Sequence, residues 1–454
     1  MGSEDRAWIE DAVAFLSAPV PDEAMTRGTH VVADVLSAAV AGVDTDANER
    51  VATGMSLPPG DASVVGTTRT TDPGSAALLN ATAAITPEVE EGHNTGGHVG
   101  ASIVVGGFAL AEAHDADGEA FLEGVVRAYE LCTRIENAIF LMKDRMNEAL
   151  PWLLRDPHST WTTIGPAVAG AIAMGADEET VAEAFRLGAN LAVVSMHDPY
   201  EEGTPARNFT AGFSAQAGVN AALAAVAGLD GSRSAMTEVY DPLREMKGEA
   251  FDESFAALGD EWTILENYYK FTPSCRYTHA PLGALERVVD DVRVDDVESV
   301  DVYAYRNACD LDYTDYTTMT SAKFSIPYVL GRYLAVGGRD LWLDDFTGDA
   351  LEDSETRALA ERVQLHHDEQ YEELFPEHWS ARVEVTHTDG RTVESECIDA
   401  PGDYRNFPGE ARLVAKFDRL LASRLGPEQA PGALDALLGV RDSQVRAVGA
   451  TLRP

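Results

Sequence analysis

Lysine is almost missing from this 454-residue chain, which carries 34 basic against 76 acidic residues and a net charge of −42. Nucleic-acid binding needs a basic surface, so we expect no nucleic acid as a partner. Because 45% of the residues are hydrophobic, the chain is still predicted to fold. An acidic, lysine-poor surface indicates a salt-rich cytoplasm, since at about 1 M salt the Debye length falls to ~3 Å and charge repulsion is screened. The five lysines are Lys143, Lys247, Lys270, Lys323 and Lys416.

Cofactor and membrane signals are missing as well. The four cysteines contain no CxxC pair, so neither a zinc nor an iron–sulfur site is expected. The stretch 64–74, VVGTTRTTDPG, lacks the spacing of a P-loop or Rossmann glycine motif, and we predict no metal and no cofactor. No apolar run approaches the ~20 residues of a membrane span, and Glu4 and Asp5 are unlike a secretory signal. We therefore expect a cytoplasmic protein without a membrane partner.

The chain length predicts two or three domains, and the patterning changes near residue 265, which favours two. Residues 1–265 have helical periodicity, and their Ala- and Gly-rich runs favour closely packed central helices. Beyond them, 297–306 alternates as a half-buried strand, and 381–400 alternates on both sides of Asp389-Gly390 as a β-hairpin does. The C-terminal tail returns to a helical pattern and is predicted to pack on the first domain. The Ala- and Gly-rich runs are 100–113, 165–176 and 211–228, and later helical stretches are expected at 324–335, 355–366, 408–424 and 431–450.

Four of the 11 histidines lie in or beside small, polar, turn-prone segments that are unlike a protein core. His98, with His93 nearby, follows the acidic EEGHNTGG, while His158 lies in RDPHSTWTT and His279 in CRYTHAP. Each segment is close to an Ala-rich run, so converging helix ends would bring these imidazoles into one pocket. Histidine is the side chain best suited to move protons near neutral pH, which favours acid–base chemistry. The alternative is a set of solvated turns in which Ser and Thr cap the helices.

Cations suited to carboxylates lie in two further segments. Arg207, in TPARNFTAGF, precedes the 211–228 run, and arginine can bind a carboxylate with two parallel hydrogen bonds. The segment KFTPSCRYTH places Lys270, Arg276 and His279 within ten residues at the predicted domain junction. Domain junctions are common ligand sites, so a binding role is favoured there.

Nine segments, in order, carry a resemblance to a known family. They are DVLSAAVAG (34–42), ALLNATAAITPEVEEG (77–92), GHVGAS (97–102), LEGVVRAYELCTRI (122–135), HSTWTTIGPAVAGAIAMG (158–175), RNFTAGFSAQAGVNAALAA (207–225), YKFTPSCRYTHAPLGAL (269–285), AKFSIPYVLGRYLAVG (322–337) and DGRT with the KF at 416–417. In their order and spacing these segments resemble the MmgE/PrpD family, which includes 2-methylcitrate dehydratases and cis-aconitate decarboxylases. The resemblance runs almost from end to end.

The resemblance implies a mainly α protein that forms a homodimer. A large all-α helical domain, 1–265 plus 400–454, would carry an inserted smaller α+β lid domain, 266–399, with the pocket between them. Three departures from the family pattern stand out: its DFDDT-like acidic stretch reads EVEEG here, its substrate-binding lysine is Arg207, and the histidine three residues later is Thr210. The positions that match the family's active site are His98, His158, Arg207 and His279, with Glu88 at a functional acid.

We therefore predict a lyase without a cofactor that acts on a small di- or tricarboxylate, similar to 2-methylcitrate dehydratase. It would remove a proton α to a carboxylate and expel a β-hydroxyl. The expected catalytic residues are His98, His158, His279 and Glu88, and the expected substrate-binding residues are Arg207, Lys270, Arg276 and Thr210. A cis-aconitate-type decarboxylase, an epimerase or isomerase, and an inactive carboxylate-binding homologue remain as alternatives.

Overall fold

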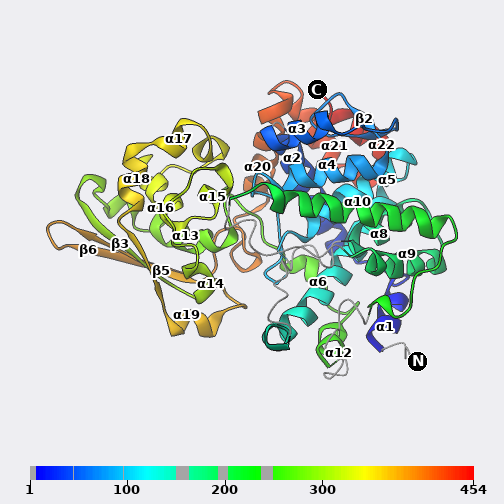
Figure 1. Cartoon of the computed structure of the whole chain (residues 1–454), viewed down its shortest axis with the longest axis horizontal. Helices are drawn as coiled ribbons and strands as arrows, with labels where there is room; N and C mark the ends of the chain where they lie inside the picture. Colours follow the sequence, from blue (N-terminus) through cyan, green and yellow to red (C-terminus); the bar gives the residue numbers. More distant parts are fainter. Residues whose placement is uncertain (1–6, 44, 96, 150–162, 193–202, 237–248) are drawn as a thin grey trace.

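The computed structural model describes residues 7–43, 45–95, 97–149, 163–192, 203–236 and 249–454. Two hydrophobic cores organise these residues. The first is built from residues 8–269 together with 413–452, and the second from residues 280–400. Figure 1 shows the corresponding arrangement, with the sheet and its helices on one side and the blue-to-green helices with the red C-terminal helices on the other. The predicted fold class, mainly helical with an α+β part, is confirmed.

Long helices that bury Ala-rich faces form the first core. The predicted central runs are confirmed as helices, and the glycines within them let the backbones approach closely. A Cβ added at Gly106 or Gly218 would lie 2.3 or 2.4 Å from the side chain of Pro166, which is less than van der Waals contact allows. The helices of this part are α1 (Ala7–Phe15), α2 (Asp22–Gly42), α3 (Asp46–Gly54), α4 (Pro73–Ile85), α5 (Val99–Ala113), α6 (Gly118–Ala149), α8 (Ile164–Ala173), α9 (Glu178–Asn190), α10 (Ala206–Val226) and α12 (Glu249–Phe255). A short hairpin, β1 (Ala62–Ser63) and β2 (Thr70–Thr71), interrupts them.

The C-terminal tail joins this helical core, as Figure 1 also shows. It consists of α20 (Glu410–Leu425), α21 (Ala430–Leu438) and α22 (Val445–Thr451). The single helix predicted over 431–450 is wrong in its middle, where the chain leaves the helix to pair with the start of α6. There the Gly118 N–H donates to the Ser443 carbonyl at 2.8 Å, and the Val445 N–H donates to the Ala116 carbonyl at 3.0 Å.

A four-stranded mixed sheet carries the second core. Its order is β4-β3-β5-β6, with β4 parallel to β3 and the other neighbours antiparallel. The strands are β3 (Val297–Ala304), β4 (Val363–His367), β5 (Ala381–His387) and β6 (Thr392–Cys397), so the predicted strand and hairpin are confirmed. The accompanying helices are α13 (His279–Glu286), α14 (Arg306–Cys309), α15 (Met319–Lys323), α16 (Ile326–Ala335), α17 (Asp349–Glu352), α18 (Ser354–Ala360) and α19 (Glu369–Leu374).

The helix predicted over 355–366 is wrong in its second half. The helix α18 ends at Ala360, and the chain continues as β4, which pairs in parallel with β3. Val363 and Leu365 pack on the second core while Gln364 is exposed, so a period of two replaces the helical period. Among the described residues, no helix is both long and apolar enough to cross a bilayer.

Candidate active site

The acidic loop 86–98 joins α4 to α5 and is tied to the segment that carries Lys270. The Gly92 N–H donates to the Tyr268 carbonyl at 3.1 Å, and the Tyr268 N–H donates back to Gly92 at 2.8 Å. A Cβ at Gly92 would lie 2.4 Å from the Gly97 carbonyl oxygen and 2.5 Å from the Tyr268 hydroxyl, so this position has no room for a larger residue. These two neighbours account for the glycine at the end of EVEEG, and the backbone pairing with Tyr268 holds the loop beside Lys270.

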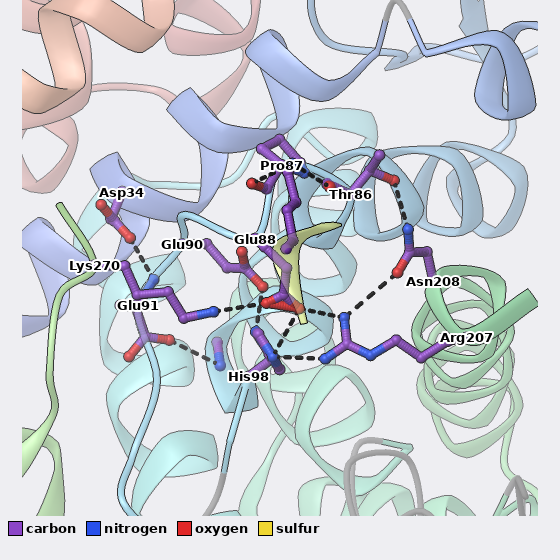
Figure 2. A network of polar contacts seen from close by, with 12 residues as sticks. Asp34, Thr86, Pro87, Glu88, Glu90, Glu91, His98, Arg207, Asn208 and Lys270 are labelled. Carbon is purple, nitrogen blue, oxygen red and sulfur yellow. Dashed lines mark hydrogen bonds and ion pairs between the residues drawn. The ribbon is translucent and has the colours of Figure 1, made fainter. Parts of the chain in front are cut away.

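Glu88 is the centre of a buried polar network (Figure 2). Its Oε1 accepts from Arg207 Nη1 at 2.5 Å and its Oε2 from Lys270 Nζ at 2.8 Å, while His98 Nε2 lies 3.4 Å from Oε1. Burial by itself would raise the pKa of Glu88, but the positive charges of Arg207 and Lys270 hold that pKa well below its usual range. Glu88 is therefore an anion that binds two cations contributed by distant segments.

Glu90 and His98 form a dyad beside it. The His98 Nδ1 contacts Glu90 Oε1, and its Nε2 lies 2.8 Å from Arg207 Nη2. Since the guanidinium and the carboxylate have opposite hydrogen-bonding roles, Nδ1–H donates to Glu90 and Nε2 keeps a lone pair. Burial lowers the pKa of His98, although Glu88 and Glu90 act in the opposite direction. The ring is thus neutral near pH 7, and its Nε2 lone pair accepts from the Arg207 guanidinium.

The two cations are as deeply buried as the acids. Lys270 is 0% and Arg207 5% exposed. Arg207 lies in the first turn of α10, and its guanidinium carbon is 5.2 Å from the centre of the Phe324 ring. Buried charges are stable only when they are paired, and here two cations balance the carboxylates of Glu88 and Glu90. A small anion that replaced the Glu88 carboxylate would meet the same two donors.

Glu91 connects the acidic loop to helices α5 and α6. Its Oε1 accepts from the Gly100 N–H at 3.0 Å, in the first turn of α5, and its Oε2 accepts from the Tyr129 hydroxyl at 2.8 Å. The Glu91 N–H donates to Asp34, which also pairs with Lys416. Burial raises the pKa of Glu91 to about 8 and that of Asp34 to about 6. These contacts hold the helix end that presents His98.

The structure brings together four of the predicted site residues, namely Glu88, His98, Arg207 and Lys270. The other predicted residues have different neighbours. The Arg276 guanidinium donates to Asp403 at 2.8 Å and lies 4.4 Å from the centre of the Tyr268 ring. His279 donates from Nε2 to the Ser274 carbonyl at 3.2 Å, and burial lowers its pKa well below the usual range. The Thr210 hydroxyl donates to Ala206 in its own helix, and His158 lies outside the described residues.

Sequence reasoning missed Glu90, Glu91 and Lys323. Lys323 is 1% exposed and donates from Nζ to the carbonyls of Pro87 at 2.7 Å and Thr86 at 3.2 Å, directly before Glu88. The rarity of lysine was the available signal. Lys270, Lys323 and Lys416, the lysines whose side chains are described, are all buried and all contact the acidic loop or its support, Asp34.

No curated protein sequence matches the chain. Residues 12–245 match the family model of the MmgE/PrpD N-terminal domain, and residues 272–438 match that of the MmgE/PrpD C-terminal domain. The loop with Glu88 and His98 and the start of α10 lie in the first match, and Lys323 lies in the second. The chain belongs to the MmgE/PrpD family.

Proposed function

We propose that this protein is a lyase that uses its own side chains to dehydrate a small di- or tricarboxylate, in the manner of a 2-methylcitrate dehydratase. Members of its family are dehydratases and decarboxylases of small carboxylates. The single observation that carries the proposal is the buried Glu90–His98 dyad, whose Nε2 accepts from the guanidinium of Arg207, one of the two cations that bind Glu88.

His98 would act as the base. A substrate carboxylate draws the Arg207 guanidinium away from Nε2, which then accepts the proton from the carbon α to that carboxylate, and Glu90 stabilises the imidazolium that forms. The C–H and C–O bonds break, the C=C bond forms, and the hydroxyl leaves as water after accepting a proton from an acid. General base catalysis of this kind contributes about 10²–10⁴ in rate.

Arg207 and Lys270 would bind the α-carboxylate and stabilise the charge that develops on it as the proton leaves. In the structure both cations bind Glu88. A substrate carboxylate must therefore replace the Glu88 carboxylate or bind the two cations beside it. Because Glu88 and Glu90 already balance these two cations, a substrate with two or three carboxylates needs further donors. Arg276 is the candidate, since its Nε and Nη1 have no hydrogen-bond partner within the described part of the chain.

The acid that protonates the leaving hydroxyl is assigned to His158, with His279 as the second candidate. Thr210 is retained as a substrate-binding candidate, one turn beyond Arg207 in α10. We also propose that the chain divides into a helical domain, 1–265 plus 400–454, and an α+β lid domain, 266–399. The two hydrophobic cores support a division near these boundaries, although Tyr269 packs in the first core and Ala400 in the second. We further propose that the protein is a homodimer and that it is active at high salt. Light scattering in molar KCl tests whether it is a dimer.

Proton NMR in D₂O tests the reaction. The protein is incubated in molar KCl with 2-methylcitrate, citrate or cis-aconitate. Dehydration of 2-methylcitrate or citrate gives alkene signals and supports the proposal. Loss of a carbon from cis-aconitate indicates a decarboxylase, and exchange for deuterium without elimination indicates an epimerase or isomerase. Binding shifts without any reaction indicate an inactive carboxylate-binding protein. Each of these last three outcomes contradicts the dehydratase.

A further inference from the structure

Lys323 is a buried lysine that the proposed chemistry does not use. It ends the short helix α15, which begins at a capping box made by Thr318 and Ser321. Its Nζ lies between the carbonyls of Thr86 and Pro87, more than 230 residues earlier in the chain. A side chain from the part of the chain with the second core thus holds the backbone of the acidic loop.

The backbone at Glu88 needs such support. Its φ is +55°, in the left-handed region that residues with a Cβ rarely adopt. This conformation is unfavourable for a residue with a Cβ and persists only where the surroundings impose it. The two carbonyls that Lys323 binds belong to the residues immediately before Glu88, so the lysine fixes the turn from which the Glu88 side chain leaves.

The neighbours of Lys323 contact the other half of the network. The Phe324 ring lies under the Arg207 guanidinium, at 5.2 Å. The Thr318 hydroxyl donates to the Gly203 carbonyl at 3.1 Å, just before α10 begins. The segment 318–324 therefore contacts both the turn that carries Glu88 and the helix end that carries Arg207.

The contacts of Lys323 with the two carbonyls do not require a charged side chain. Burial lowers the pKa of Lys323 to about 7, although Glu88 and Glu90 act to raise it. A neutral amine has two N–H groups, which match the two carbonyls, so the same contacts persist in either protonation state. Hydrogen bonding to the loop backbone, rather than ion pairing, is the role that the geometry supports.

We propose that Lys323 is a positioning residue that holds the turn before Glu88, so that the carboxylate meets Arg207, Lys270 and His98. The site of the N-terminal part would then be complete only when segment 318–324 is seated against it. The effect of Lys323 on catalysis rests on the proposed function, whereas its role in holding the acidic loop does not.

The test compares Lys323→Met with Arg332→Met. The methionine has a similar length but cannot donate, whereas Arg332 on α16 pairs with Asp345 and contacts neither the acidic loop nor α10 in the described structure. Hydrogen–deuterium exchange by mass spectrometry reads the loop without any need for activity. We expect peptides that span 85–98 to exchange at least ~10-fold faster in Lys323→Met and at the wild-type rate in Arg332→Met.

Kinetics on the acid that the wild type turns over give the second reading. We expect kcat to fall at least ~10-fold in Lys323→Met with KM within about 3-fold, and Lys323→Arg, which keeps the donors, to recover most of the loss. Unchanged exchange in the 85–98 peptides overturns the inference, and so does a rise in KM at constant kcat, which would make Lys323 a substrate ligand. If the wild type acts on none of the acids but the 85–98 peptides still exchange faster in Lys323→Met, the positioning role is supported and the proposed function is contradicted. If Lys323→Met does not fold, Lys323→Leu, which also lacks a donor, replaces it in both measurements.

Discussion

Replacement of Glu90 by glutamine is the sharpest test of the proposed base. Glu90 is 0% exposed, its Oε1 contacts His98 Nδ1, and its Oε2 has no hydrogen-bond partner among the described residues. Glutamine keeps the shape but removes the charge. If its oxygen faces Nδ1, the amide NH₂ is buried without an acceptor. If its NH₂ faces Nδ1, the imidazole must carry its proton on Nε2 and loses the lone pair.

The expected loss follows from these two effects. A hydrogen bond to a charged group is worth roughly 1.5–3 kcal/mol, and a buried unsatisfied donor disfavours the active orientation by roughly 1–3 kcal/mol. The sum is about 2.5 kcal/mol from the lower ends of these ranges and about 4 kcal/mol from their middles. Each ~1.4 kcal/mol is a factor of ten in rate. We therefore expect kcat to fall about 10²- to 10³-fold, with little change in KM because Arg207 and Lys270 are intact.

Initial rates of alkene formation measure the effect, and circular dichroism confirms that the variant is folded. The matched control is Glu394→Gln on β6, where the glutamate side chain is 64% exposed and a loss of charge should leave the rate unchanged. A folded Glu90→Gln variant with kcat within about 3-fold of wild type would refute the role of the dyad.

Three further predictions follow from the same network. Because burial lowers the pKa of His98 below 6.5 and the neutral ring is the active form, the acid limb of the kcat/KM profile should lie below pH 6.5; a limb above pH 7 would contradict the assignment. Lys416→Met leaves Asp34 buried without its cation and should lower the free energy of unfolding by roughly 3–5 kcal/mol in denaturant titrations, most of it recovered by adding Asp34→Asn; an additive double variant argues against the pair. His158→Ala should lower turnover at least ~10²-fold with the fold intact, and near-normal turnover would remove His158 from the mechanism.

Local patterns in the sequence were enough for much of the fold. Alternation predicts the strand at 297–306 and the hairpin around Asp389-Gly390, because one face of each strand packs on the core. The error at 355–366 has a tertiary cause. Pairing with β3 decides that Val363–His367 is a strand, and that partner lies more than 60 residues away.

The site residues likewise divide into those that the sequence reveals and those that only the structure reveals. His98 and Arg207 are recognisable because their segments are unusual for a core, and Glu88 through the family resemblance. Glu90 looks like one more residue of an acidic surface until His98 is seen against it, and Lys323 looks like the end of an amphipathic stretch. Their roles depend on contacts between distant segments, which no local pattern encodes.

A crystal structure with citrate bound tests the central claim most directly. The account predicts one citrate carboxylate within hydrogen-bond distance of both Arg207 and Lys270, with the carbon that loses its proton about 3–3.5 Å from His98 Nε2. Citrate bound away from these residues, with Glu88 still bridging the two cations, would contradict it.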